Sequence, residues 1–381
     1  MRIYLIAVEP SADHLGAELA QALRAELPRL SLAGIGGPKM QAIGIPSQMP
    51  TEGLAIIGFT EVLTKIPVIL EGLKQSTARI LEAQPDAVIL IDSYGFMIRL
   101  AKRLRKAGYN GKIIKYVAPQ VWATRPKRAK VLADHVDGLL AIHSFEPDWF
   151  TPHGLDTHYV GNAVFDTDYG AGDPNKLRQQ YNLSDRPILS VFLGSRVGEV
   201  VRLSPAFTDA VQILRQRLPD LAILCPVSES VAKEVGAQAA KDLRMNDMIL
   251  LPESAKLDAM SCSMAALACS GTVTTQLACA GVPTVVAYRM SPVTHAIVSR
   301  IFQPNHISIV NIAANEKLMP EFLQNEVTGE ALADALIPYL SDTKKRAAAR
   351  DALLEQTRLM AGQPDETASA RAAQAILQIL D

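Results

Sequence analysis

The sequence has 381 residues, and its 38 Lys and Arg against 39 Asp and Glu give a formal net charge of −1 at pH 7. A chain of this length exceeds what one hydrophobic core normally supports, so we expect two α/β domains of ordinary size. The balanced charge excludes a global electrostatic field that would recruit nucleic acid or an anionic surface, and no nucleic-acid partner is expected.

Two further features bear on location and on redox chemistry. No window holds the roughly 18 uninterrupted apolar residues of a membrane-spanning helix, and the first residues lead into a strand pattern instead of a cleavable leader, so a cytoplasmic protein is expected. The four cysteines lack close pairing in the sequence, and three lie among apolar or small residues. They are predicted to be inert core thiols rather than metal ligands or disulfide partners.

Short apolar runs bounded by turn residues recur along the first half of the chain with the spacing of β-α units. The runs are residues 3–8, 87–91, 112–117 and 138–142, with amphipathic stretches such as 15–27 and 97–106 between them. Continuous apolar strands alternating with helices predict a parallel sheet covered on both faces. Ligands of such sheets bind beyond the carboxyl ends of the strands, so the residues directly after each run are the functional candidates.

The turn after the first apolar run carries two carboxylates and a hydroxyl. A helix cap explains Ser11 or Asp13 but leaves Glu9 unexplained, so Glu9 and Asp13 are catalytic candidates. The loop at residues 34–40 is rich in glycine, which lets backbone approach a ligand closely, although a tight turn alone would also use such a run.

A stripe of apolar side chains follows at helical spacing. It is either core-facing or a short amphipathic element that lies on a membrane, and Pro67 would kink it. The stripe consists of Val62, Leu63, Ile66, Ile69 and Leu70.

Asp92 comes directly after the apolar run at 87–91. A partly desolvated carboxylate at that edge of the sheet is placed to act as a general base. The alternative is that Asp92 caps the helix that starts near Phe96.

An indole and several cations follow the apolar run at 112–117. Trp122, Arg125, Lys127 and Arg128 are candidates for binding an anionic, amphipathic acceptor. A solvated helix edge would explain the charges equally well.

The stretch 165–184 is rich in Asp, Gly, Asn and Pro and divides the strand series in two. We therefore expect domains at 1–165 and 166–345, followed by a helical tail at 346–381. The strands expected in the second domain are residues 188–192, 221–224, 248–251, 265–269, 284–288 and 307–310.

Two loops of the second domain have the character of phosphate sites. Arg196, with Ser195 and Glu199 beside it, follows a strand, and the free amides of such a loop suit a diphosphate. The stretch from Ser270 through Gly271 and Thr272 opens a helix after another strand, and a plain Ser/Thr cap is the alternative there. No Asp-x-Asp metal pair stands beside either loop, so neither a metal nor a cofactor is expected.

Taken in order, these segments resemble the lipid-A-disaccharide synthases, glycosyltransferase family nineteen, over essentially the whole chain. The resemblance is carried by residues 9–13, 36–40, 91–92, 119–128, 194–200, 270–272, 288–290 and 310–311. It implies a GT-B fold, with two Rossmann-like domains that face a central cleft. It also implies that Asp92 and Arg196 are essential, and it adds Gln276, Arg289, Met290 and Asn311 to the UDP-sugar site.

The same resemblance implies an inverting, metal-free reaction. A 2,3-diacylglucosamine unit passes from UDP to 2,3-diacylglucosamine 1-phosphate (lipid X), giving the β-1,6 disaccharide of lipid A. The protein would sit peripherally on the inner face of the inner membrane. Its C-terminal helices would return to the first domain or exchange between the subunits of a homodimer.

The sequence departs from the family pattern at six positions. The family commonly has Gly at Val8 and Ala12, Asp at Gly95, Pro at Leu193, His at Asn162 and Glu at Gln276. A neutral Gln276 bonds ribose hydroxyls more weakly than a glutamate. A UDP-sugar epimerase of the same fold and a non-catalytic nucleotide-sugar binder remain alternatives. A dinucleotide-dependent oxidoreductase is disfavoured, because residues 8–13 lack the required glycines.

Overall fold

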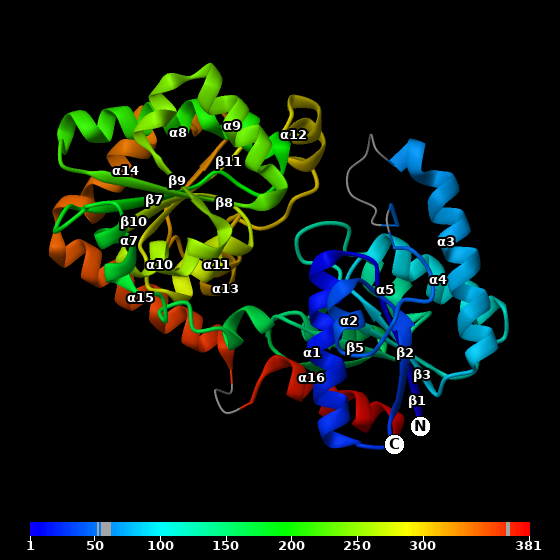
Figure 1. Cartoon of the computed structure of the whole chain (residues 1–381). Helices are drawn as coiled ribbons and strands as arrows, with labels where there is room; N and C mark the ends of the chain where they lie inside the picture. Colours follow the sequence, from blue (N-terminus) through cyan, green and yellow to red (C-terminus); the bar gives the residue numbers. More distant parts are fainter. Residues whose placement is uncertain (52, 55–61, 363–365) are drawn as a thin grey trace. The chain divides into compact units, whose positions relative to one another are not determined.

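The computed structural model describes residues 1–51, 53–54, 62–362 and 366–381. The chain forms two compact units, Met1–Ala163 with Gln363–Asp381, and Val164–Gly362 (Figure 1). Each unit contains a parallel sheet with helices on its faces, which confirms the predicted α/β class.

The sheet of the first unit has the strand order β2-β1-β3-β4-β5-β6, with all described neighbours parallel. The four predicted apolar runs correspond to β1, β3, β4 and β5. The strands β2 and β6 were missed because they lie at the sheet edges, where partial exposure removes the continuous apolar run. The strands are β1 Arg2–Ala7, β2 Ser31–Ile35, β3 Ala87–Ile91, β4 Lys112–Tyr116, β5 Gly138–Ala141 and β6 Asp156–Tyr159.

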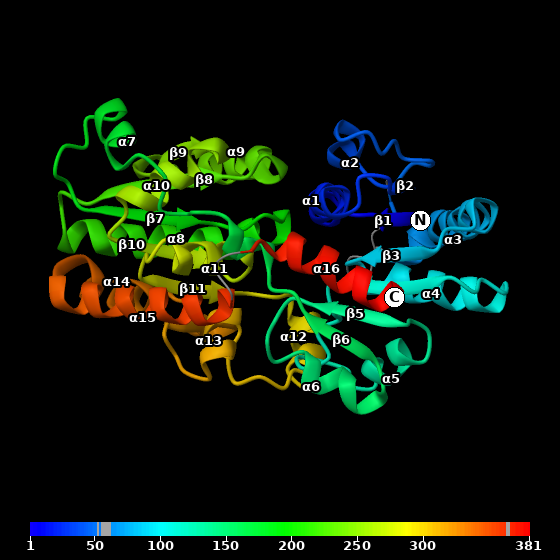
Figure 2. The ribbon, with the colours of Figure 1, turned by 90° about the horizontal axis from the view of Figure 1, so that it is seen from below.

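Helices cover both faces of this sheet. On one face α1 and α16 pack together (Figure 2). Leu19, Leu23 and Ile376 share a buried cluster with the strands. Gly138 permits the close approach of α16, because a Cβ there would lie 2.6 Å from Cδ1 of Ile379. The other face holds α3 and α4. The helices are α1 Pro10–Glu26, α2 Pro38–Ala42, α3 Val62–Ala83, α4 Tyr94–Lys106, α5 Arg128–Ala133, α6 Pro147–Phe150 and α16 Ala368–Leu380.

The sheet of the second unit has the order β12-β11-β10-β7-β8-β9 and is also parallel across its described pairs. The prediction of a strand at 307–310 is wrong. Ser308 instead caps a helix that starts at Ile309, and its hydroxyl accepts a hydrogen bond from the Asn311 amide. The strands are β7 Ile188–Phe192, β8 Ala222–Val227, β9 Ile249–Pro252, β10 Ala265–Cys269, β11 Thr284–Tyr288 and β12 Glu321–Leu323.

The second unit contains residues 346–362 of the segment that was expected to form the tail. Here α15 packs against α11, α13 and α14, so the chain leaves this unit at Gly362 and only then reaches α16. All four cysteines are free, and three of them are buried, as predicted. The helices are α7 Pro174–Gln180, α8 Val197–Arg217, α9 Ala232–Lys241, α10 Lys256–Cys262, α11 Thr272–Cys279, α12 Pro292–Val298, α13 Ile309–Ala314, α14 Gly329–Ser341 and α15 Thr343–Ala361.

Candidate active site

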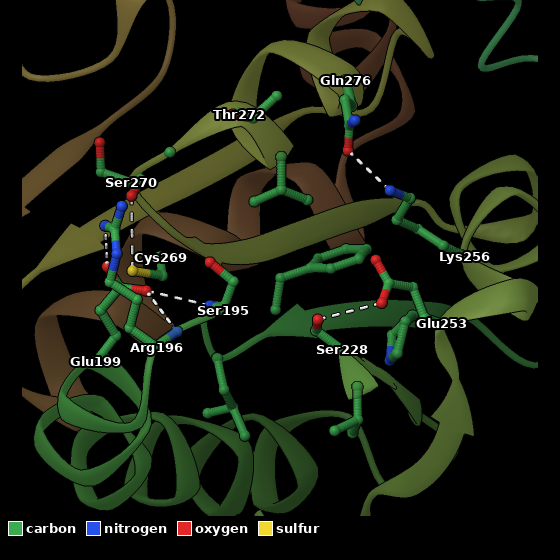
Figure 3. Close-up of a pocket in the computed structure, with 17 residues that line it drawn as sticks. Ser195, Arg196, Glu199, Ser228, Glu253, Lys256, Cys269, Ser270, Thr272 and Gln276 are labelled. Atoms are coloured by element: carbon green, nitrogen blue, oxygen red, sulfur yellow. Dashed lines mark hydrogen bonds and ion pairs between the residues drawn. The ribbon is translucent and has the colours of Figure 1, made fainter. Parts of the chain in front are cut away.

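A cavity of about 320 Å³ lies in the second unit, where β7, β8, β9 and β10 end (Figure 3). Both predicted phosphate loops contribute to its wall, as the carboxyl-end rule for parallel sheets requires. The predicted donor residues that line it are Ser195, Arg196, Glu199, Ser270, Gly271, Thr272 and Gln276.

The side chain of Glu199 stabilises the first loop, residues 194–196, through hydrogen bonds. Oε2 of this carboxylate accepts hydrogen bonds from the amides of Ser195 at 3.1 Å and Arg196 at 3.2 Å, and Oε1 accepts from Nη1 of Arg196 at 3.0 Å. Gly194 adopts φ 107°, and a Cβ there would lie 2.6 Å from Oε2 of Glu199. Glu199 is 5% exposed, whereas the Arg196 side chain is 67% exposed. Glu199 therefore shapes the loop, and Arg196 is the residue that reaches a ligand.

The second loop leads into the N-terminus of α11. Gly271 is the N-cap, and the Ser270 amide is tied to the carbonyl of Ala287 at 3.1 Å. The amides of the first turn of α11 and the hydroxyl of Thr272 border the cavity. The positive end of the helix dipole and these donors suit a phosphate group.

Three polar side chains that line the cavity were missed by the sequence analysis: Ser228, Glu253 and Lys256. Nζ of Lys256 donates to Oε1 of Gln276 at 3.1 Å, and Oγ of Ser228 donates to Glu253 at 3.1 Å (Figure 3). Ser228 directly follows β8, Glu253 directly follows β9, and Lys256 begins α10 four residues after the end of β9. The rule that favours residues directly after strands would have found Ser228 and Glu253 had it been applied to those two strands.

Arg289, Met290 and Asn311 are not among the residues that line this cavity in the described structure. The Arg289 guanidinium donates to the carbonyls of Gln324 at 3.0 Å and Val327 at 2.5 Å, and the Met290 amide donates to the Gln324 side chain at 2.9 Å. Asn311 is fully buried and pairs both of its amide atoms with the backbone of Met319. These contacts stabilise the second unit around β11 and β12. The geometry therefore gives Arg289, Met290 and Asn311 no direct contact with this cavity.

In the first unit, the residues after β1 and β3 meet. The Ser93 hydroxyl donates a hydrogen bond to Oε1 of Glu9. Asp92 and Ser93 both adopt the left-handed backbone region, with φ 52° and 38°, which costs on the order of 1 kcal/mol or more for each non-glycine residue. This turn leaves Asp92 partly buried at the carboxyl edge of the sheet. Ser93, not Asp92, is the N-cap of α4, so the capping alternative does not account for Asp92.

Asp13 has a structural role that differs from the catalytic roles expected of Glu9 and Asp92. Its carboxylate accepts hydrogen bonds from the amides of Gly37 at 2.7 Å, Lys39 at 2.8 Å and Met40 at 3.1 Å, and the residue is 3% exposed. Asp13 therefore anchors the glycine-rich loop, and both of its carboxylate oxygens already accept hydrogen bonds. Glu9 stays a candidate.

The predicted acceptor residues separate into a buried member and three surface members. Trp122 is only 8% exposed, and its indole donates to Oε1 of Glu146 at 3.2 Å, so it does not offer an open stacking surface. Arg125 and Lys127 are exposed, and Arg128 lies over the ring of Tyr94 at 4.9 Å. Burial, and then the neighbouring Arg125, lower the pKa of Arg128. Arg125 and Arg128 therefore form a local positive cluster, which favours the binding of an anion.

The apolar stripe of α3 is divided by the structure. Ile69 is 6% exposed and belongs to the core, so its assignment to a membrane face is wrong. Ile66 and Leu70 are 40% and 50% exposed, and Val68 beside them is also exposed. The side chains of Val62 and Leu63 lie outside the described residues. No helix in the described ranges is long and apolar enough to cross a bilayer.

A family model described as lipid-A-disaccharide synthetase matches residues 3–377. The chain belongs to this family. Lipid-A-disaccharide synthases of Rhodospirillum centenum and Pseudomonas aeruginosa are 41% and 34% identical to it, over 99% and 100% of this chain and 94% and 98% of theirs. Membership in the lipid-A-disaccharide synthase family confirms the predicted glycosyltransferase over the epimerase and the non-catalytic binder.

Solved structures similar to this family member share its fold at low identity. The co-structure of S. aureus MnaA with UDP has a TM-score of 0.66 at 15% identity, covering 100% of this chain and 96% of that one. Acinetobacter baumannii MurG has a TM-score of 0.57 at 16% identity, covering 99% of each. These likenesses confirm the predicted GT-B fold and carry nothing beyond it.

Proposed function

We propose that this chain transfers the 2,3-diacylglucosamine unit of a UDP donor to the 6-hydroxyl of 2,3-diacylglucosamine 1-phosphate, inverts the anomeric carbon and releases UDP. The match of residues 3–377 to the family model carries this proposal. The two units supply separate parts of the chemistry, a donor pocket in the second and a carboxylate pair in the first.

The donor diphosphate binds between Arg196 and the N-terminus of α11. The exposed guanidinium and the free amides of the helix start supply donors for the developing charge on UDP as it leaves. Lys256 and Gln276 also line this pocket and contact the nucleoside part of the donor. No metal ion is needed in this mechanism.

Asp92 is the general base that takes the proton of the acceptor 6-hydroxyl. Its position at the end of a fully buried strand, in a left-handed turn next to Glu9, supports that role. The acceptor phosphate binds the positive cluster formed by Arg99, Arg125 and Arg128. Lys127 adds a further exposed cation beside this cluster.

The exposed part of α3 attaches the protein to the inner face of the inner membrane, where both acylated substrates reside. Ile66, Val68 and Leu70 each expose 40% or more of their surface. A homodimer is not needed for this mechanism, because α16 already packs against α1 of its own chain.

Purified protein incubated with UDP-2,3-diacylglucosamine and 2,3-diacylglucosamine 1-phosphate should yield a disaccharide 1-phosphate and UDP, resolved by mass spectrometry. An epimerase would instead convert the UDP-sugar in the absence of acceptor. A non-catalytic binder would leave both substrates unchanged. Either of these outcomes would exclude the proposed reaction.

A further inference from the structure

A lysine lies inside the core of the first unit, on the central strand β4. Lys115 is 1% exposed, and the alternation along β4 places it on the same sheet face as the buried Ile113. A fully buried ammonium group is costly unless it has a function or an ion partner.

The ammonium group is linked to Asp92 through a single oxygen. Nζ of Lys115 donates to the carbonyl of Tyr116 at 2.7 Å, and the backbone amide of Asp92 donates to the same carbonyl at 2.9 Å. Among the described residues, this is the hydrogen bond that Lys115 makes with its side chain, although an ammonium group has three donors. Two of its three N–H donors therefore have no hydrogen-bond partner among the described residues.

Three carboxylates from three elements interact electrostatically with this cation. They are Asp92 after β3, Glu9 after β1 and Glu146 at the start of α6. Burial lowers the pKa of Lys115 to about 7, and the three negative charges oppose that shift. Burial likewise raises the pKa of Glu146 to about 7, although its oxygens accept hydrogen bonds from Trp122 and from the amides of Ile142 and His143.

The imidazole of His143 also lies in this region and packs edge-on against Trp122. Burial lowers its pKa to about 4, so it carries no charge at neutral pH. The buried cation whose charge acts on Asp92 and Glu9 is therefore Lys115.

We propose that Lys115 is a positioning residue for the transfer reaction: it fixes the Asp92 turn through the shared Tyr116 carbonyl, and its positive charge attracts the carboxylates of Asp92 and Glu9 as the acceptor binds. This proposal rests on the proposed role of Asp92 as the base. Lys115 touches neither substrate in this scheme and acts through the two carboxylates.

The test is the pH dependence of kcat/KM for Lys115→Met and Lys115→Gln. Both variants remove the charge, whereas the Gln side chain can still donate to Tyr116. If the charge acts on the base, the acid limb of both profiles should move up by about 1 pH unit, which is about a tenfold loss on that limb. The loss should fade towards pH 9, where the wild-type lysine is neutral. The acceptor phosphate also titrates near pH 6, but equally with every variant.

Lys112→Met is the matched control, because Lys112 is an exposed lysine on the same strand, and its profile should overlay that of the wild type. A uniform loss at every pH in the Met variant, or a Gln variant with the wild-type profile, would overturn the charge role. Melting curves of each variant report folding. Failure of the proposed function is distinguishable: then wild type makes no disaccharide, or Asp92→Asn stays active. If only this inference fails, wild type makes disaccharide and Asp92→Asn is inactive, but the pH profiles of the Lys115 variants do not shift.

Discussion

The hydroxyl of Ser93 donates a hydrogen bond to the carboxylate of Glu9, which joins the first turns after β3 and β1. This bond satisfies one oxygen of Glu9 and orients the segment that carries Asp92. The two neighbouring strands thereby present their carboxylates as one unit at the edge of the sheet.

Replacement of Ser93 by Ala should remove that bond and weaken the transferase. A hydrogen bond to a charged group contributes about 1.5 to 3 kcal/mol, so we expect kcat/KM to fall by about tenfold or more. The UDP dissociation constant should not change, since the donor pocket lies in the other unit. Steady-state kinetics with calorimetric UDP titration measure both, and Ser11→Ala, at an exposed neighbour, is the control. Unaltered kinetics in Ser93→Ala would show that the bond is dispensable.

Asp92→Asn preserves the shape of the side chain and removes its ability to accept a proton. Turnover should fall by about 10² to 10⁴, as for the loss of a general base, with UDP affinity nearly intact. Single-turnover kinetics would separate this chemical defect from slow product release. Near-normal turnover would reassign the base to Glu9, because the carboxylate of Asp13 is occupied by three backbone amides.

Arg196→Ala should cost about 10² to 10³ in kcat, comparable to the loss of one oxyanion donor. The protein should remain folded, because Glu199 still holds the loop amides of Ser195 and residue 196. Activity of the wild type should survive EDTA, since the helix start and the guanidinium supply the charge stabilisation. Loss of activity in EDTA that Mg²⁺ or Mn²⁺ restores would contradict the metal-free mechanism.

The buried lysine makes a separate prediction for stability. The folded pKa of Lys115 is lowered from 10.5 to about 7, so the unfolded chain binds more protons at this site between those two values. Stability therefore rises with pH through that window, and the full cost of the buried charge applies below pH 7. Lys115→Met should be more stable than wild type by several kcal/mol below pH 7, with a difference that shrinks towards pH 10.

Urea unfolding at several pH values measures this difference. Lys112→Met should show no pH-dependent gain, because that side chain is exposed. A stability difference that stays constant from pH 6 to pH 10 would mean that Lys115 contributes through packing and not through charge.

The sequence predicts the buried strands of both sheets well, because residues 87–91 or 188–192 are buried on every side and must be continuously apolar. Edge strands such as β12 lack that pattern, and the short apolar run at 307–310 contains the Ser308 cap, so helix and strand could not be separated there. The two phosphate loops were predicted because each follows a strand, and both line the same cavity.

Residue type alone could not assign the partners of polar side chains. Asp13 binds amides 24 to 27 positions away, and the indole of Trp122 binds Glu146, a residue that the sequence did not single out. Both contacts depend on how distant segments pack. Lys115 did carry a local signal, because a lysine inside a strand otherwise buried on both faces needs an electrostatic reason.

Substitutions on α3 test membrane attachment, and Ile69 on the same helix provides the matched control. Ile66 and Leu70 are exposed, and Ile69 between them is buried. An exposed Ile or Leu that enters a lipid interface contributes on the order of 1 kcal/mol or more of apolar burial, so several together suffice for reversible attachment. Ile66→Ser with Leu70→Ser should therefore reduce binding to anionic liposomes in a co-sedimentation assay and leave the melting temperature almost unchanged.

Ile69→Ser should behave in the opposite way. It places a hydroxyl and a cavity inside the core of the first unit, so the free energy of unfolding should fall by about 2 to 5 kcal/mol, while liposome binding per folded molecule stays at the wild-type level. The basic residues Arg103 and Lys106 in the last turn of α4 add salt-sensitive attraction to anionic lipid, so wild-type binding should weaken as ionic strength rises. If the double variant binds liposomes as well as wild type does, attachment depends on another surface, and α3 serves only to cover the sheet.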